Sequence, residues 1–150
     1  MMTDALLQLS TAQAVTASAV STNTIDLSLA RDIGTGNCLY AVFTVDVAAT
    51  AAGAATVTFQ IISSAAAALT SPTILVQTDA IGKAELTLGR RPIVLEIPAT
   101  ILAAQPIGQR YLGVQYTVAT GPLTAGSFSA TITDSTVDVG KHYASGFTVA

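Results

Sequence analysis

Few residues of this chain could carry out nucleophilic or metal-dependent chemistry. The 150 residues include one histidine, His142, and one cysteine, Cys38. A catalytic triad needs a nucleophile, a base and an orienting acid, and a structural zinc site needs several histidine or cysteine ligands. His142 lies in a Lys-His-Tyr segment, and a cysteine directly before a strand is typically a small apolar filler. We therefore expect no triad, no zinc site and no internal disulfide.

The acidic residues and the glycines are also poorly placed for chemistry. Glu85 and Glu96 are the only glutamates, and Glu96 alternates with apolar neighbours as a solvated strand residue does. Asp134 and Asp138 are too few for the oxygen cage of a calcium site. The glycine-rich residues 32–37 lack the following helix that a phosphate-binding loop requires. We expect a protein that is not an enzyme and that binds no metal or cofactor.

Positive charge is most concentrated at Arg90, Arg91 and Arg110. Two interpretations are open: these arginines form ion pairs with Asp79 or Glu85, or they form a patch that docks on an acidic surface. The chain has six Lys and Arg against nine Asp and Glu, a net charge of −3, and no run of basic residues. Because nucleic-acid binding depends on neutralising many phosphates, this composition predicts no nucleic-acid partner.

The composition is that of a compact and unusually uncharged domain. It is 51% hydrophobic and 10% charged, where soluble domains average about 25% charged residues. The length predicts one domain over residues 1–150. The most apolar stretch, residues 41–69, is interrupted by Asp46 and Gln60, so we expect no membrane span. An acid, Asp4, stands where a secretory signal would be basic, so we also expect no export signal.

Alternation of apolar with Thr, Ser or Gln residues indicates strands that have one buried face. Residues 40–48 and 56–63 show this alternation most clearly, and we predict that they form a hairpin. The residues of the first run expected to face the core are Ala41, Phe43, Val45 and Val47. Those of the second run are Val57, Phe59 and Ile61. Further strands are predicted at residues 20–29, 73–78, 92–97, 110–119 and 126–134, bounded by turn residues.

Seven to eight short strands without interspersed helices predict an all-β, antiparallel β-sandwich. An immunoglobulin-like domain would have a tryptophan and paired cysteines, and this chain has no tryptophan and one cysteine. We therefore predict the jelly-roll type. Residues 1–19 are expected to form an extended N-terminal arm, and residues 139–150 a C-terminal tail.

Several blocks of sequence, in order, resemble the capsid cement (decoration) proteins of tailed bacteriophages. The blocks are residues 4–10 (DALLQLS), 12–16 (AQAVT), 21–27 (STNTIDL), 110–116 (RYLGVQY) and 121–126 (GPLTAG). The resemblance implies a jelly-roll subunit that is made in the host cytoplasm and forms dimers or trimers on the outer surface of the virion head. There it would clamp neighbouring copies of the major capsid protein through its extended termini and by strand addition. The family has no catalytic motif.

On this basis we expect capsid contacts in the arm, in the tail and at the arginines. The candidate interaction residues are Leu6, Leu7, Leu9, Arg90, Arg91, Arg110, His142, Tyr143 and Phe147. The arm would add backbone hydrogen bonds to an exposed sheet edge, so deleting residues 1–14 should leave a folded domain that no longer binds capsids. An alternative is a carbohydrate-binding jelly roll on a virion surface, which would stack sugars on Tyr40 and Tyr111 if both lined one concave face.

Overall fold

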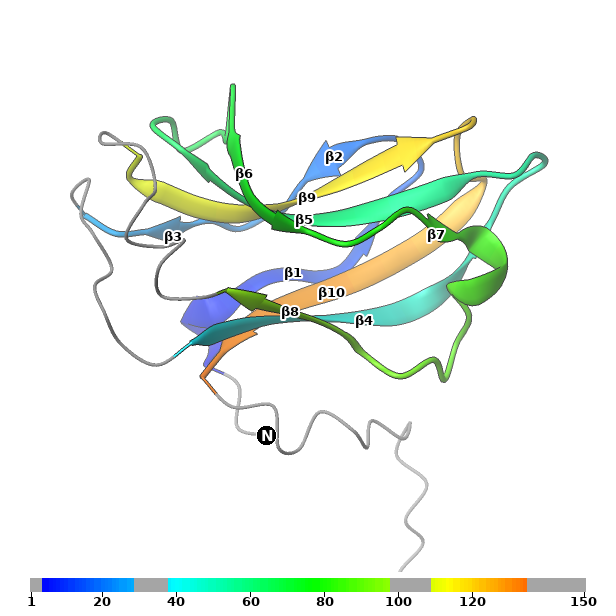
Figure 1. Ribbon diagram of the computed structural model, residues 1–150, viewed down its shortest axis with the longest axis horizontal. Coiled ribbons are helices and arrows are strands. Elements are labelled where there is room, and N and C mark those ends of the chain that lie inside the picture. Colours follow the sequence, from blue (N-terminus) through cyan, green and yellow to red (C-terminus); the bar gives the residue numbers. More distant parts are fainter. Residues whose placement is uncertain (1–3, 29–37, 98–108, 135–150) are drawn as a thin grey trace, which may run out of the picture.

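The computed structural model describes residues 4–28, 38–97 and 109–134, which form two antiparallel β-sheets packed face to face (Figure 1). The first sheet, sheet A, has the strand order β1 (Gln8–Ala14), β10 (Ala125–Thr133), β4 (Leu39–Thr50) and β8 (Ile93–Ile97). Sheet B has the order β2 (Ala19–Val20), β9 (Tyr111–Ala119), β5 (Thr56–Ser64) and β6 (Thr73–Gln77). In sheet B, β3 (Ile25–Asp26) also pairs with β9, and β7 (Ile81–Gly82) also pairs with β5. Two 3-10 turns complete the described elements, η1 (Ala5–Leu7) and η2 (Lys83–Glu85).

The chain passes from one sheet to the other at most connections, which confirms the predicted jelly-roll sandwich. The β5–β6 connection is an exception, because these two strands are neighbours in sheet B. The predicted hairpin of residues 40–48 with 56–63 was wrong. β4 pairs with β8 and β10, whereas β5 pairs with β6, β7 and β9. The two strands instead face each other across the sandwich, where the ring centroids of Phe43 and Phe59 lie 5.1 Å apart. An apolar inner face is compatible with either arrangement, so the alternation did not distinguish them.

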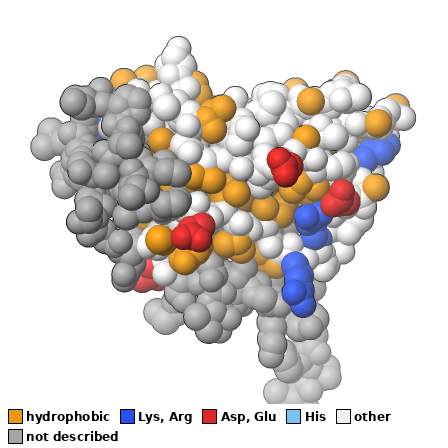
Figure 2. All heavy atoms as spheres, in the orientation of Figure 1, with side chains coloured by type: hydrophobic (Ala, Val, Ile, Leu, Met, Phe, Trp, Pro, Cys, Tyr) orange, Lys and Arg blue, Asp and Glu red, His pale blue; other side chains and the backbone are white. Residues whose placement is uncertain are grey.

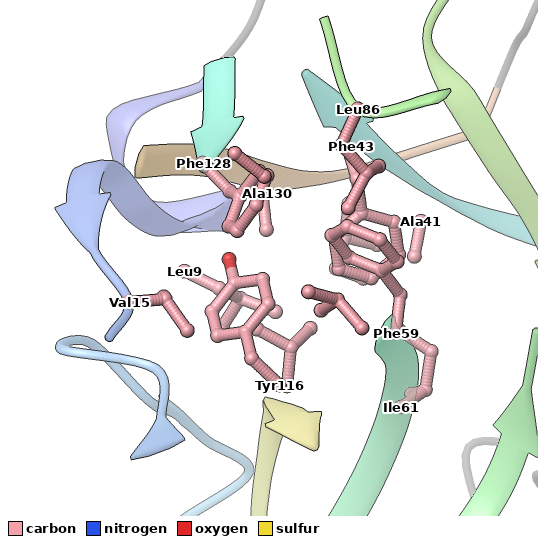
Figure 3. Packing of buried hydrophobic residues seen from close by; sticks show 14 of the residues in the cluster. Leu9, Val15, Ala41, Phe43, Phe59, Ile61, Leu86, Tyr116, Phe128 and Ala130 are labelled. Carbon is pink, nitrogen blue, oxygen red and sulfur yellow. The ribbon is translucent and has the colours of Figure 1, made fainter. Parts of the chain in front are cut away.

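Aromatic side chains from both sheets fill the centre of the core (Figure 3). Phe43 and Phe128 project from sheet A, and Phe59 and Tyr116 from sheet B. Their ring centroids lie 5.1–6.2 Å apart, mostly in tilted or edge-to-face arrangements, which aromatic quadrupoles favour. All four side chains are at most 1% exposed. The rigid centre of the domain is therefore aromatic although the chain holds few aromatic residues.

The predicted inner faces are confirmed except at one position of β4. Ala41 and Phe43 are buried in the core, as are the three predicted residues of β5. Val47 instead has 47% of its side chain exposed. Phe128 pairs with Val45 and the preceding residue of β10, Ser127, pairs with Val47, so β4 has an extra residue at this step. This bulge interrupts the alternation on which the prediction for Val47 depended.

The N-terminal segment was predicted to be an extended arm, and for residues 8–14 this was wrong. β1 pairs with β10 at the edge of sheet A, and Leu9 and Ser10 are completely buried. An extended arm and a strand have the same extended backbone, and here residues 8–14 find their partner strand in the protein's own sheet. Deletion of residues 1–14 would remove this strand, so the structure does not support the expectation of a folded remainder.

The predicted strand at residues 20–29 is divided in the structure. β2 and β3 are two-residue strands that pair with different parts of β9. Between them Ser21 Oγ donates a hydrogen bond to the carbonyl oxygen of Asn23 at 2.7 Å, which turns the backbone. In the described ranges no helix has the length and apolar character needed to cross a bilayer.

Candidate interaction surface

Three leucines near the N-terminus were predicted to contact a partner, and the structure gives each a different environment. Asp4 caps η1 through its Oδ1 atom, which accepts a hydrogen bond from the Leu6 backbone N–H at 2.9 Å. The turn leaves the Leu6 side chain 82% exposed, and places Leu7 half-buried against the core. Leu9 is fully buried in β1 and cannot contact a partner. The prediction for Leu9 was therefore wrong, whereas Leu6 is available at the surface.

A hollow of about 280 Å³ lies beside this turn, where η1 meets the start of β4 and the end of β10. Its apolar lining continues the hydrophobic core to the surface, because Ile132 belongs to the core and Leu7 and Leu39 pack against it. Its polar lining includes two exposed carboxylates. The lining residues are Asp4, Leu7, Leu39, Ile132, Thr133 and Asp134. We call this feature the acidic hollow.

Two of the three candidate arginines are held by acidic side chains. Arg110 binds Asp26 in a bidentate pair, with distances of 2.6 Å from Nε to Oδ1 and 2.7 Å from Nη2 to Oδ2. This hydrogen bonding lowers the pKa of Asp26 and raises the pKa of Arg110. Arg90 approaches Glu85, with 3.4 Å between Nη1 and Oε2. The ion-pair interpretation is confirmed for Arg90 with Glu85, and Arg110 is paired with a carboxylate that the sequence did not indicate.

The three arginines do not form one patch. Arg90 and Arg91 lie between η2 and β8, and η2 follows Gly82, which pairs with Thr56 at the start of β5. The Arg110 backbone N–H donates to the carbonyl oxygen of Ser64, the last residue of β5. The full length of β5 therefore separates the two sites. Arg91 is exposed and forms no ion pair with any residue of the described ranges.

Apolar side chains also gather along the open side of the sandwich, between the edge strands β6 and β8. Figure 2 shows apolar side chains as a band across this side, with the lysine and arginine side chains gathered toward one end. Three large apolar side chains on these elements are exposed: Ile74 of β6 (49%), Val94 of β8 (38%) and Leu88 in the loop before β8 (65%). Ile74 and Val94 alternate with neighbours that pack on the core, so they lie on the outer faces of the two sheets. Sequence reasoning missed all three. A signal was present in the sequence, because the runs Thr-Ile-Leu-Val and Ile-Val-Leu place apolar residues on both faces of a strand.

The two tyrosines proposed for sugar stacking lie on opposite outer faces. Tyr40 alternates with the inward-facing Leu39 and Ala41 of sheet A. Tyr111 precedes the inward-facing Leu112 of sheet B, and its ring lies under the Arg110 guanidinium at 5.2 Å. This pair of tyrosines therefore does not line one concave face.

The remaining candidate interaction residues belong to the predicted C-terminal tail. His142, Tyr143 and Phe147, with the whole predicted tail of residues 139–150, lie outside the described residues. Within those residues there is no group of three or more His, Cys, Asp or Glu that could hold a metal ion. Cys38 is a half-buried free thiol.

The comparison with protein families covers nearly the whole sandwich. A family model named Bbp16 matches residues 9–132. The chain belongs to the Bbp16 family. The match starts in β1 and ends in β10, so it includes both of these paired strands of sheet A and excludes η1. No curated protein matches the sequence.

Proposed function

We propose that this member of the Bbp16 family is a capsid cement protein. It binds the outer surface of a tailed-phage head and stabilises the contacts between major capsid protein subunits. The observation that carries the proposal is the exposure of large apolar side chains at η1 and along the β6–β8 side, where Leu6 and Leu88 are 82% and 65% exposed. Apolar surface of this kind marks sites of protein contact. Membership of the Bbp16 family is consistent with a phage origin.

The mechanism is stabilisation by preferential binding. A protein that binds the assembled shell, and not its separated subunits, stabilises the shell by its binding free energy. At a free concentration of 100 times the dissociation constant, each occupied site contributes about 2.7 kcal/mol. The packed aromatic core holds together the two sheets that carry the surface residues, which lowers the backbone entropy lost on binding.

The contact elements differ from those expected from the sequence. The strand predicted to be added to the shell, β1, is the edge strand of the protein's own sheet A, where it pairs with β10. Among the described residues, the exposed apolar side chains lie on the η1 turn with Leu6 and at the edge strands β6 and β8. Edge strands offer backbone hydrogen-bonding groups to a partner strand. We also propose a dimer or trimer as the binding unit, which sedimentation equilibrium of the free protein measures directly.

Co-sedimentation with phage heads that lack the protein tests the proposal. We expect the wild-type protein to pellet with the heads and to saturate at a fixed number of copies. A variant with Leu6→Ser and Leu88→Ser should bind more weakly, because it loses exposed apolar contact area. Ala54→Ser, at another exposed position, serves as the matched control and should bind as the wild type does. Wild-type protein that stays in the supernatant at saturating concentration would contradict the proposal.

A further inference from the structure

We propose that the acidic hollow receives a lysine or arginine side chain of the major capsid protein. This inference rests on the proposed function and specifies the chemistry of the partner. The hollow combines an apolar floor with two carboxylates, and long basic side chains match both parts. Their hydrocarbon stems pack on apolar surface while the charged end stays near the surface.

The hollow has room for a long side chain. Its volume of about 280 Å³ is below the roughly 300–1,000 Å³ of pockets that hold drug-sized molecules. Its apolar lining by Leu7, Leu39 and Ile132 is the end of the hydrophobic core and is therefore held in place by the sandwich. A preformed cavity of this kind lowers the entropy lost on binding.

The charges around the hollow favour a cation. Asp4 uses Oδ1 to cap η1, and in the described part of the chain its Oδ2 atom has no hydrogen-bond partner. Asp134 is exposed, and neither carboxylate forms an ion pair with a described residue. The lysine and arginines near η2 lie at the other end of the sandwich, and Arg110 is bound to Asp26. Within the described ranges, therefore, no basic side chain neutralises the two carboxylates, and a basic side chain of a partner would complement them.

The exposed Leu6 extends the same contact. It follows Asp4 on the η1 turn and is the most exposed large apolar side chain of the described residues. Leu6 stands in the chain between Asp4 and Leu7, which both line the hollow, so a capsid segment at the hollow would reach the turn that carries Leu6. Interfaces commonly combine such an apolar anchor with a charged pair at the rim.

Neutralising both carboxylates tests the inference. Asp4→Asn retains a side-chain oxygen that can cap η1, so the double variant Asp4→Asn, Asp134→Asn should fold normally. The control is Asp79→Asn, which removes one exposed carboxylate elsewhere and so has half the charge change of the double variant. The two single variants, Asp4→Asn and Asp134→Asn, have the same charge change as this control. We expect the double variant to bind phage heads about five- to tenfold more weakly, with a smaller dependence on salt, and Asp79→Asn to bind normally.

The outcomes separate this inference from the proposed function. If the wild type binds heads and the double variant binds equally well, the inference is wrong and the proposed function stands. If the wild type does not bind at all, the proposed function fails and the inference fails with it. If the free double variant and the variant Lys141→Gln both lose thermal stability to the same extent, the occupant of the hollow is the protein's own tail. A loss of self-association would identify a second copy, and either result would overturn the inference.

Discussion

At the scale of single residues, the hydroxyl of Tyr116 connects the two sheets. It extends from β9 across the core and lies 2.5 Å from the Ser10 hydroxyl on β1, and both residues are fully buried (Figure 3 shows the Tyr116 side chain). A buried hydroxyl without a partner is costly, so each residue requires the other. This pair orients β1 on the sandwich and was not predictable from the sequence, because the two residues are 106 positions apart.

Tyr116→Phe should lower the free energy of unfolding by about 1–3 kcal/mol, because it leaves the Ser10 hydroxyl buried without its partner. Urea denaturation measures the change. Ser10→Ala should have a similar effect, and the double variant should lose less than the sum of the two single losses. Additive losses would show that the two hydroxyls are not coupled.

Burial also raises the pKa of Tyr116 above its ordinary value of 10.0. Above about pH 10 the unfolded chain therefore releases a proton that the folded protein keeps, and stability must fall as the pH rises. We expect a decline approaching 1.4 kcal/mol per pH unit from this group. Tyr116→Phe should remove that part of the decline, whereas Tyr111→Phe, a half-buried control, should retain it. Equal alkaline slopes in all three proteins would contradict the assignment.

At the scale of elements, the loop after β5 folds over the outer face of sheet B. Ser64 Oγ donates a hydrogen bond to the Thr70 carbonyl at 2.8 Å and accepts one from the Ala66 N–H at 3.1 Å, which holds the loop closed. The Leu69 side chain then covers Gly113 of β9 and is 2% exposed. A glycine is needed at this position because the Leu69 side chain occupies the space of a Cβ atom.

Gly113→Ala should therefore destabilise the protein by about 1–3 kcal/mol, because the new methyl group overlaps Leu69 and approaches Ser21 Oγ to 3.1 Å. Thermal or urea unfolding measures the loss. Gly82→Ala is the matched control, since a methyl group at that position would have no neighbouring atom within 4 Å. Adding Leu69→Ala to Gly113→Ala should cost less than the two single losses combined, and strict additivity would argue against the clash.

The N-terminal strand gives a second test at this scale. Leu9→Ala should lower the free energy of unfolding by about 2–5 kcal/mol, because the side chain is fully buried in the core. Leu6→Ala, in the preceding turn and 82% exposed, should change it by less than about 0.5 kcal/mol. Equal effects of the two substitutions on unfolding would mean that β1 is not part of the folded sandwich.

The sequence predicted the strands better than their partners. Alternation located β4, β5, β9 and β10 because it depends only on which side of a strand is buried. Alternation could not assign strand pairing. Two consecutive strands show the same alternation whether they pair within one sheet or face each other across the sandwich. It also failed at Val47, where a bulge changes the period.

The exposure of the candidate interaction residues also depends on contacts that the local sequence pattern does not contain. Leu6, Leu7 and Leu9 are identical in type and close in sequence, and only the turn at η1 determines which of them is exposed. The acidic hollow combines residues from the two ends of the described chain with one from β4, so no local pattern could reveal it. Long-range contacts of this kind depend on topology.

At the scale of the whole molecule, the described surface has distinct regions at its two ends. The acidic hollow lies at the end where β10 finishes, and Lys83, Arg90 and Arg91 cluster near η2 at the other end. Between them, the β6–β8 side exposes an apolar band (Figure 2). A protein with separate contact regions can bridge more than one subunit of a shell, which is the action proposed here.

The disassembly temperature of phage heads that lack the protein, measured with increasing amounts of purified protein, tests this account most directly. Because binding to the intact shell stabilises it, the temperature should rise with protein concentration and level off when the sites are full. A disassembly temperature that stays constant up to saturating protein would contradict the account.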